Sequence, residues 1–196
     1  MTEPSYRTFF RGDYQRAWRS TLARADTAAE VQSLIDQLGL APGQSVLDTV
    51  CGHGRHAVPL AAHGFRGTGA DLSEQEIAAA REAASLAQVD AHFVVSDMRE
   101  LPFSGEFDAA YNFYTSFGFL ESEEEDLRAL RAFHGALRTG GRFLIDRMNP
   151  AAIVRGFQPQ GWEVLEGGAV VLRQREIDFR RGAIIERVEM HEPGGA

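Results

Sequence analysis

Three carboxylates and one glycine turn are the residues of this chain whose types and spacing indicate chemistry. Asp48 ends the apolar run Val46-Leu47 and leads into Gly52-His53-Gly54. Two further acids, Asp71 and Asp97, each follow a later apolar run. Glycines after a buried strand let a ligand approach the backbone where a helix begins, and such helix N-termini bind nucleotides. The pattern therefore predicts a nucleotide-type binding site.

The same glycine turn is compatible with two different nucleotides. Residues Gly52 to Ala57 match the Gly-x-Gly-x-x-Gly/Ala dinucleotide pattern. Asp71 lies close to the position where that pattern expects an acidic residue. This match would indicate an NAD-linked oxidoreductase. Asp48 argues against NAD, because a carboxylate just before the turn would repel a pyrophosphate. S-adenosylmethionine (SAM) carries an ammonium and a sulfonium instead, so Asp48 would attract it. Asp71 would accept from the ribose hydroxyls and Asp97 from the adenine amino group.

Read in order, these motifs resemble those of the class I SAM-dependent methyltransferases, and within them a bacterial branch that acts on small molecules. Five segments carry the resemblance: Val46-Leu47-Asp48 with Cys51 to His56, Gly69 to Ser73, Asp97 to Phe103, Phe107-Asp108, and Leu137 to Arg142. The resemblance implies a Rossmann-like fold, SAM as cofactor and a small-molecule methyl acceptor as partner.

The resemblance also implies which residues contact each part of SAM. Asp48 would lie with the glycines around the methionine moiety, Asp71 at the ribose and Asp97 at the adenine. Leu72 and Met98 would flank the adenine faces. The full set of expected cofactor-binding residues is Tyr14, Asp48, Cys51, Gly52, Gly54, Arg55, Asp71, Leu72, Asp97, Met98 and Asn112.

The chain differs from the family pattern in two places. Val50 stands where the first glycine of the usual Gly-x-Gly-x-Gly turn would be, which removes one left-handed position and adds bulk near the cofactor. The family also usually continues for roughly another 50 residues, with a final helix and an antiparallel strand pair, so we expect an open sheet edge here. Pairing of two such edges would give a homodimer.

Helix and strand signals alternate through most of the chain. Three capping patterns, Thr27-x-x-Glu30, Ser73-x-x-Glu76 and Ser122-x-x-Glu125, predict helix starts. Short apolar runs typical of buried strands lie between the helices, at 46–47, 65–72, 93–95, 109–113 and 143–145. This alternation predicts an α/β fold: a Rossmann-like, doubly wound, mostly parallel sheet with helices on both faces and its ligand at the carboxyl ends of the strands.

The character of the chain changes after Pro150. Apolar runs at 164–165, 169–179 and 183–190, with a turn at Arg180-Arg181-Gly182, predict an antiparallel hairpin. We therefore expect one methyltransferase domain over residues 1–196. It would comprise an N-terminal helical cap at 1–40 whose Tyr14 region folds over the cofactor, a SAM-binding core at 41–149 and an antiparallel substrate-side segment at 150–196.

Methyl transfer requires mainly that a nucleophile be aligned with the methyl group and that water be kept out. An amine or phenol acceptor would also lose a proton to a nearby base. The candidates are Tyr114 and Asn112, expected in the loop after the fourth strand, and His53 beside the glycine turn. A histidine in such a place is more often a packing residue than a base. The acidic run 123–126 more simply complements a helix N-terminus.

Composition limits the other possibilities. The chain has 196 residues, of which 44% are hydrophobic and 24% charged, as in one ordinary globular domain. No apolar stretch approaches the roughly 20 residues of a membrane span and no secretory leader is recognised, so we expect a cytoplasmic protein without membrane contact. The single cysteine, Cys51, excludes an intramolecular disulfide and argues against a metal site. None of the 20 basic residues is lysine, which excludes lysine-dependent chemistry.

A nucleic-acid acceptor is not expected. The net charge of −8 has the wrong sign for a polyanion. Enzymes that methylate nucleic-acid amino groups resemble one another in an Asn/Asp-Pro-Pro-aromatic loop, where this chain has Asn112-Phe113-Tyr114-Thr115. Two alternatives to a small-molecule methyltransferase stay open: a protein of the same fold that binds SAM or S-adenosylhomocysteine without turnover, and the NAD-linked oxidoreductase.

Overall fold

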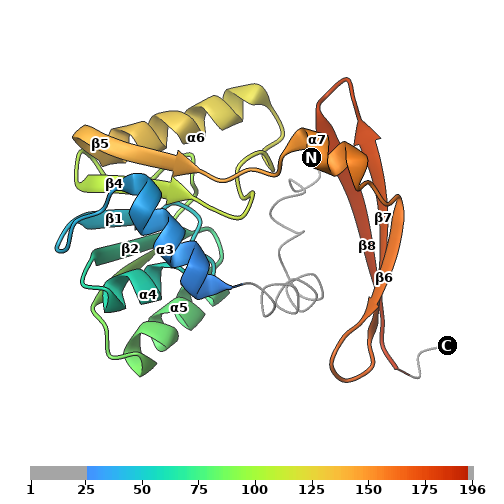
Figure 1. The fold of residues 1–196 in the computed structure, drawn as a ribbon, viewed down its shortest axis with the longest axis horizontal. Coiled ribbons are helices and arrows are strands. Elements are labelled where there is room, and N and C mark those ends of the chain that lie inside the picture. Colours follow the sequence, from blue (N-terminus) through green and yellow to red (C-terminus); the bar gives the residue numbers. More distant parts are fainter. Residues whose placement is uncertain (1–25, 194–196) are drawn as a thin grey trace. The chain divides into compact units, whose positions relative to one another are not determined.

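The computed structural model describes residues 26–193 (Figure 1). The described residues belong to two compact units, Asp26–Arg147 and the segment from Met148 onward. The expected division into a cap at 1–40, a core at 41–149 and a segment at 150–196 stays a prediction. None of the described helices is long and apolar enough to cross a membrane.

Five parallel strands form the sheet of the first unit, in the order β3-β2-β1-β4-β5. The strands are β1 (Ser45–Asp48), β2 (Arg66–Asp71), β3 (Ala91–Val95), β4 (Phe107–Asn112) and β5 (Leu137–Ile145). The chain moves outward from β1 to β3 and then crosses to β4, so the direction of winding reverses between β1 and β4. Ligands of doubly wound sheets bind at such a switch point, outside the carboxyl ends of the strands. The predicted fold class is confirmed.

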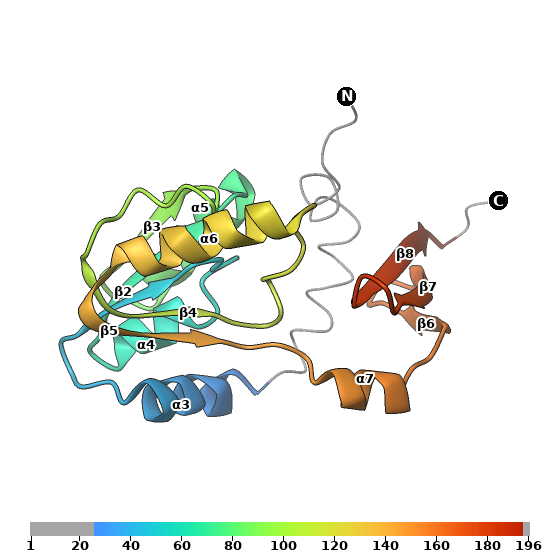
Figure 2. The same ribbon diagram turned by 90° about the horizontal axis from the view of Figure 1, so that it is seen from above.

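Helices cover both faces of this sheet. They are α3 (Thr27–Leu38), α4 (Ala57–Ala62), α5 (Glu74–Leu86) and α6 (Glu123–Ala136). Val46 packs in a cluster with α3 and α4, whereas its neighbour Leu47 packs in a cluster with Ala136 of α6. Consecutive strand residues point to opposite faces, so a buried β1 must be apolar at both positions. Figure 2 shows α3 and α6 on opposite faces of the sheet.

Two of the three predicted helix caps are confirmed. The hydroxyls of Ser73 and Ser122 each accept the N–H of the residue three positions later, over 3.3 Å. The third is wrong by one residue, because Asp26 caps α3 and Thr27 is already helical. The carboxylate of Asp26 accepts the N–H of Ala29, and both residue types are good N-caps, so the sequence pattern alone does not separate them.

The second unit contains a short helix and a three-stranded antiparallel sheet. Its elements are α7 (Pro150–Arg155), β6 (Gln160–Val164), β7 (Val170–Asp178) and β8 (Ala183–His191), with the strand order β6-β7-β8. The predicted hairpin is confirmed as β7 and β8. Leu165, Ala169 and Val171 form a small core of this unit.

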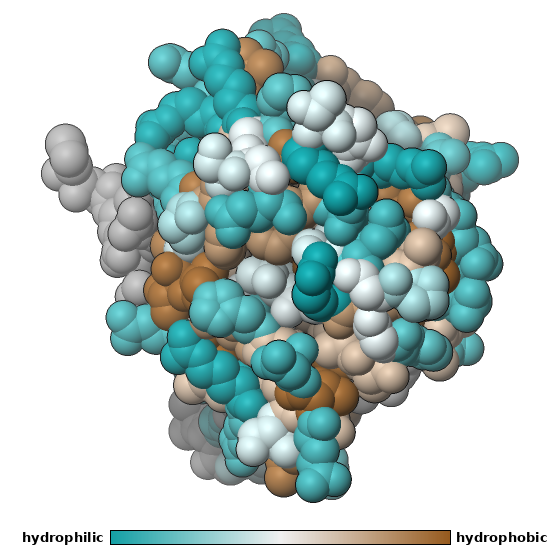
Figure 3. All heavy atoms as spheres, turned by 90° about the vertical axis from the view of Figure 1, so that its left-hand side faces the viewer, coloured by the Kyte–Doolittle hydropathy of each residue, from teal (hydrophilic) through white to brown (hydrophobic). Residues whose placement is uncertain are grey.

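The amino ends of the parallel strands form one face of the first unit. Figure 3 shows it from the left-hand side of Figure 1, and hydrophilic residues cover most of the visible surface. Apolar residues form small, separate spots there. Asp48 and Asp71 lie at the opposite ends of the strands, as the last residues of β1 and β2.

Candidate functional site

Asp48 is a buried carboxylate at the switch point of the sheet. It is the last residue of β1, where it pairs in register with Gly69 of β2 and Tyr111 of β4, and it is 3% exposed. Burial raises the pKa of Asp48 to about 7, and the negative charge of Asp71 acts in the same direction. Such a carboxylate is costly unless a cation compensates for its lost hydration.

Asp71 and Gly52 are joined by a hydrogen bond that shapes the turn after β1. The Gly52 N–H donates to Oδ2 of Asp71 over 2.9 Å, and the Ser73 N–H donates to Oδ1 over 2.9 Å. Burial raises the pKa of Asp71, while these two bonds act in the opposite direction. Gly52 has φ +52°, and a Cβ there would meet only Oε2 of Glu76, at 3.7 Å. The glycine is therefore required by its backbone conformation, and the space beside it is open.

The next predicted cofactor residues, Cys51 and Gly54, pack closely against neighbouring residues. A Cβ at Gly54, which has φ +79°, would lie 3.1 to 3.3 Å from Val58, Ala80 and Phe93. Cys51 is buried, and burial raises the pKa of its thiol. Both residues allow close contact between the start of α4, α5 and the sheet. The Cys51 thiol is therefore not exposed as a reactive group.

Arg55 links the glycine turn to two other parts of the unit. Its guanidinium donates to Thr27 over 2.9 Å and to Glu30, both on α3. The same guanidinium lies 4.9 Å from the ring centroid of Tyr114, at cation–π distance. Arg55 thereby contacts both α3 and the loop after β4.

The two histidines near the turn differ in surroundings. His56 is buried, with Nε2 3.1 Å from Oε2 of Glu30, and burial together with the charge of Arg55 lowers its pKa to about 4. His53 is 35% exposed, with Nδ1 3.5 Å from Oε2 of Glu76. His53 is therefore the histidine of this pair that a ligand can reach.

Asn112 is a strand residue, which corrects its expected place in a loop. It is the last residue of β4, is fully buried, and donates from Nδ2 to Oγ1 of Thr49 over 2.9 Å. Thr49 in turn donates to the carbonyl of Tyr111 over 3.1 Å. Oδ1 of Asn112 is buried and has no hydrogen-bond partner among the described residues. A buried acceptor without a donor is unfavourable, which suits a site that a donor on a ligand completes.

Tyr114 and Thr115 have left-handed backbone conformations, with φ of +63° and +60°. Such conformations cost about 1 to 3 kcal/mol each for residues other than glycine and gather at functional sites. The Tyr114 N–H donates to Oδ2 of Asp146 over 3.0 Å, and the Asp146 N–H donates to the carbonyl of Asn112 over 2.8 Å. Asp146 was not predicted, although it follows β5 as Asp48 and Asp71 end their strands.

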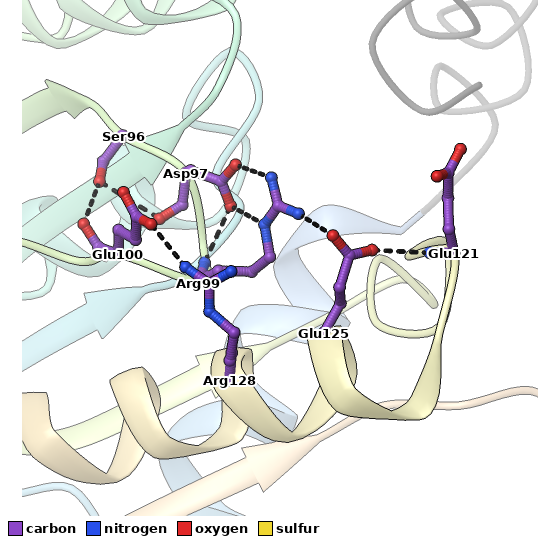
Figure 4. A network of polar contacts seen from close by, with 7 residues as sticks. All are labelled: Ser96, Asp97, Arg99, Glu100, Glu121, Glu125 and Arg128. Atoms are coloured by element: carbon purple, nitrogen blue, oxygen red, sulfur yellow. Dashed lines mark hydrogen bonds and ion pairs between the residues drawn. The ribbon is translucent and has the colours of Figure 1, made fainter. Parts of the chain in front are cut away.

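Asp97 follows β3, and its carboxylate is held by Arg99 (Figure 4). Leu72, directly after Asp71, is 38% exposed, and Met98 is half-buried. Tyr14 lies outside the described residues. Direct contacts therefore join Gly52 with Asp71 and Arg55 with Tyr114. The carboxylate of Asp97 contacts Arg99, two residues later in the chain. Within residues 26–193, no group of three or more His, Cys, Asp or Glu could hold a metal ion.

Sequence comparison finds methyltransferases. Residues 46–141 match the family described as methyltransferase domain. A protein of Geobacillus sp. named as a methyltransferase is 35% identical over 116 residues, which are 59% of this chain and 47% of that protein. An uncharacterized methyltransferase of Synechocystis sp. is 32% identical over 155 residues, 74% of this chain and 70% of that protein. The chain thus spans about half the length of the first of these relatives.

Structural comparison finds the fold of this chain among solved methyltransferase structures. The structure is similar to that of SAM-bound CalS10, an amino pentose methyltransferase from Micromonospora echinaspora involved in calicheamicin biosynthesis, with a TM-score of 0.63 and 24% identity. The match covers 92% of this chain and 81% of CalS10.

Proposed function

Because this chain belongs to the class I SAM-dependent methyltransferases, we propose that it transfers the methyl group of SAM to a small-molecule acceptor. One observation carries the proposal: the buried Asp48 lies at the switch point beside the hydrogen bond that joins Gly52 to Asp71. A carboxylate at this position favours a ligand with positive charges over one with a pyrophosphate.

The residues present suit SAM part by part. Asp48 offers an acceptor to an ammonium group, and the open space beside Gly52 allows close approach of the ligand to the backbone. The Oδ1 of Asn112 is a second acceptor at the carboxyl end of β4. Beyond its bonds from the Gly52 and Ser73 N–H groups, the Asp71 carboxylate keeps acceptor capacity for ribose hydroxyls. Asp97 would accept from the adenine amino group.

Apolar contacts would complete the adenine site. Leu72 is a partly exposed aliphatic residue next to Asp71, and Met98 is half-buried next to Asp97. Side chains of this kind gain by covering the faces of a flat ring. Cys51, Gly54 and Arg55 act on the site through packing and by holding the turn.

SAM, when bound, supplies a methyl group on a sulfonium leaving group, so the protein must mainly position the acceptor and exclude water. The loop of Tyr114 and Thr115 is held at the carboxyl end of β4 by Asp146 and Arg55, which suits it to contact the acceptor. His53 is the group that could take a proton from the acceptor, and the Tyr114 hydroxyl could accept a hydrogen bond from it. His56 is unsuited, because it is buried against Glu30.

We further propose that the acceptor is not a nucleic acid and that the protein acts in the cytoplasm. The net charge of −8 supports the first statement, since a polyanion would be repelled. The same charge, with the acidic residues at the strand ends, favours acceptors that carry an amine. A homodimer stays a prediction.

The experiment is a turnover assay with SAM labelled in its methyl group. The purified protein is incubated with panels of small amines, amino acids and phenols, and S-adenosylhomocysteine and labelled product are measured. We expect product with at least one acceptor, and none with Asp48→Asn. Asp90→Asn, an exposed aspartate before β3, serves as the matched control and should keep full activity. SAM binding without product in every panel would instead favour a binding protein of the same fold.

A further inference from the structure

Arg99 contacts both oxygens of the Asp97 carboxylate at the carboxyl end of β3. Its backbone N–H and its Nε donate to Oδ1, each over 2.9 Å, and its Nη2 donates to Oδ2 over 2.6 Å. Figure 4 shows the two side chains facing each other in this arrangement. Three donors from one residue fix the plane of the carboxylate, because an arginine fork and a carboxylate match only in a narrow range of orientations.

The other side of the guanidinium is held by α6. Nη1 of Arg99 donates to Oε1 of Glu125, in the first turn of that helix, and Oε2 of Glu125 accepts the N–H of Glu121 over 3.1 Å. Arg99 therefore lies between two carboxylates from different parts of the chain. The orientation of Asp97 depends on a helix that begins 26 residues later in the sequence.

Burial distinguishes this network from the ion pair next to it. The side chains of Arg99 and Asp97 are 11% and 17% exposed, whereas those of Arg128 and Glu100 are 46% and 70% exposed. Exposed pairs of this kind contribute little, since water competes for both partners. Arg128 and Glu100 thus offer a natural comparison within the same part of the structure (Figure 4).

We propose that Arg99 is a positioning residue that sets the preference of the site for a nucleobase with an exocyclic amino group. The proposal rests on the proposed function, in which Asp97 accepts a hydrogen bond from the adenine amino group. A carboxylate in a fixed plane meets an amino donor favourably and repels an oxygen at the same place. If it could rotate, it would turn away from such an oxygen, and the discrimination would fall.

The test compares the binding of two ligands to the full chain by calorimetry. They are S-adenosylhomocysteine and S-inosylhomocysteine, in which an oxygen replaces the amino group. The unaltered protein should bind S-adenosylhomocysteine at least about tenfold more tightly than S-inosylhomocysteine, as expected for a hydrogen bond to a charged acceptor. In Arg99→Gln the ratio of the two affinities should fall below about threefold, and Arg99→Lys, which keeps the charge but loses the fork, should give a ratio in between.

The ratio separates positioning from a merely structural role, because general loosening weakens both ligands alike. Arg128→Gln, the matched control, should keep the ratio of the unaltered protein. If Arg99→Gln does not fold, Glu125→Gln removes the negative charge from the outer contact of Arg99 and should still lower the ratio. An unchanged ratio in the folded variants, or equal binding of both ligands by the unaltered protein, would overturn this inference alone. Binding of neither ligand by the unaltered protein would overturn the proposed function as well.

Discussion

The N–H of Gly52 donates to Oδ2 of Asp71 over 2.9 Å, so the turn after β1 is held by the acid that ends β2. The bond ties two neighbouring parallel strands together beyond their last ladder pair. It also orients one oxygen of Asp71, while the Ser73 N–H orients the other. One carboxylate thus shapes the glycine turn and presents its remaining acceptor capacity at the same place.

Substitution of Asp71 should weaken SAM binding. Asp71→Asn keeps the size of the side chain but removes the charge. It also places an amide N–H₂, which cannot accept a hydrogen bond, against the N–H of either Gly52 or Ser73. We expect a loss of about 1.5–3 kcal/mol in binding free energy, the scale of hydrogen bonds to a charged group. Calorimetry with S-adenosylhomocysteine measures it, with Asp90→Asn as the control. Unchanged affinity in a folded Asp71→Asn protein would argue against the ribose role.

SAM affinity should rise with pH. Burial raises the pKa of Asp48 to about 7, so the ligand-free carboxyl is mostly protonated at about pH 6 and mostly ionised at about pH 8. An ammonium group binds the ionised form, so affinity should increase up to about tenfold across that range. Titrations at constant ionic strength check this. In Asp48→Asn the affinity should be lower and its pH profile flat through the same range; a flat profile in the unaltered protein would contradict the role of Asp48.

The same carboxyl should lower the stability of the ligand-free protein at neutral pH. Its folded-state pKa of about 7 exceeds the ordinary value of 3.8, so between these values the folded state holds a proton that the unfolded state has lost. Stability therefore falls as pH rises from about 4 to about 7. Asp48→Asn should remove this cost and raise the free energy of unfolding by about 1–4 kcal/mol at about pH 8.

Urea unfolding at about pH 8 and about pH 4 would measure the effect of Asp48→Asn, which should be absent at the lower pH. Asp90→Asn should change stability at neither pH. A variant less stable than the unaltered protein at about pH 8 would show that Asp48 contributes to folding rather than to binding.

Relief of backbone strain after β4 should also be measurable. Thr115 has φ +60°, a conformation that glycine adopts without steric penalty. Thr115→Gly should therefore stabilise the protein by about 0.5–1 kcal/mol in urea unfolding, despite the greater freedom of glycine in the unfolded chain. Thr115→Ala keeps the strain and should give no gain. If Thr115→Gly instead lowered the free energy of unfolding by the usual entropic cost of a glycine, Thr115 would not be strained in the folded protein.

The sheet could be predicted from sequence because buried parallel strands must be apolar on both faces and end in the polar residues of a site. Val46-Leu47 followed by Asp48 is such a case. The second unit gives a weaker signal, since β6 exposes Trp162 and none of the residues of α7 is buried. Without a buried face, neither element has a hydrophobic period to detect.

The site was predictable where one residue defines a role and less so where a role depends on distant partners. Asp48 and Asp71 are found at strand ends by the same rule that would have found Asp146. Asn112 was expected in a loop, but it ends β4, where its Nδ2 donates to Oγ1 of Thr49 at the neighbouring strand end. The contact of Arg99 with Glu125 spans 26 residues and has no local pattern.

The most direct test of the central claim is calorimetric titration of the purified chain with SAM, S-adenosylhomocysteine and NAD at one protein concentration. We expect both adenosyl ligands to bind with dissociation constants on the order of micromolar, about −8 kcal/mol, and NAD not to bind. Binding of NAD without SAM, or of none of the three, would contradict a SAM site built on Asp48, Gly52 and Asp71.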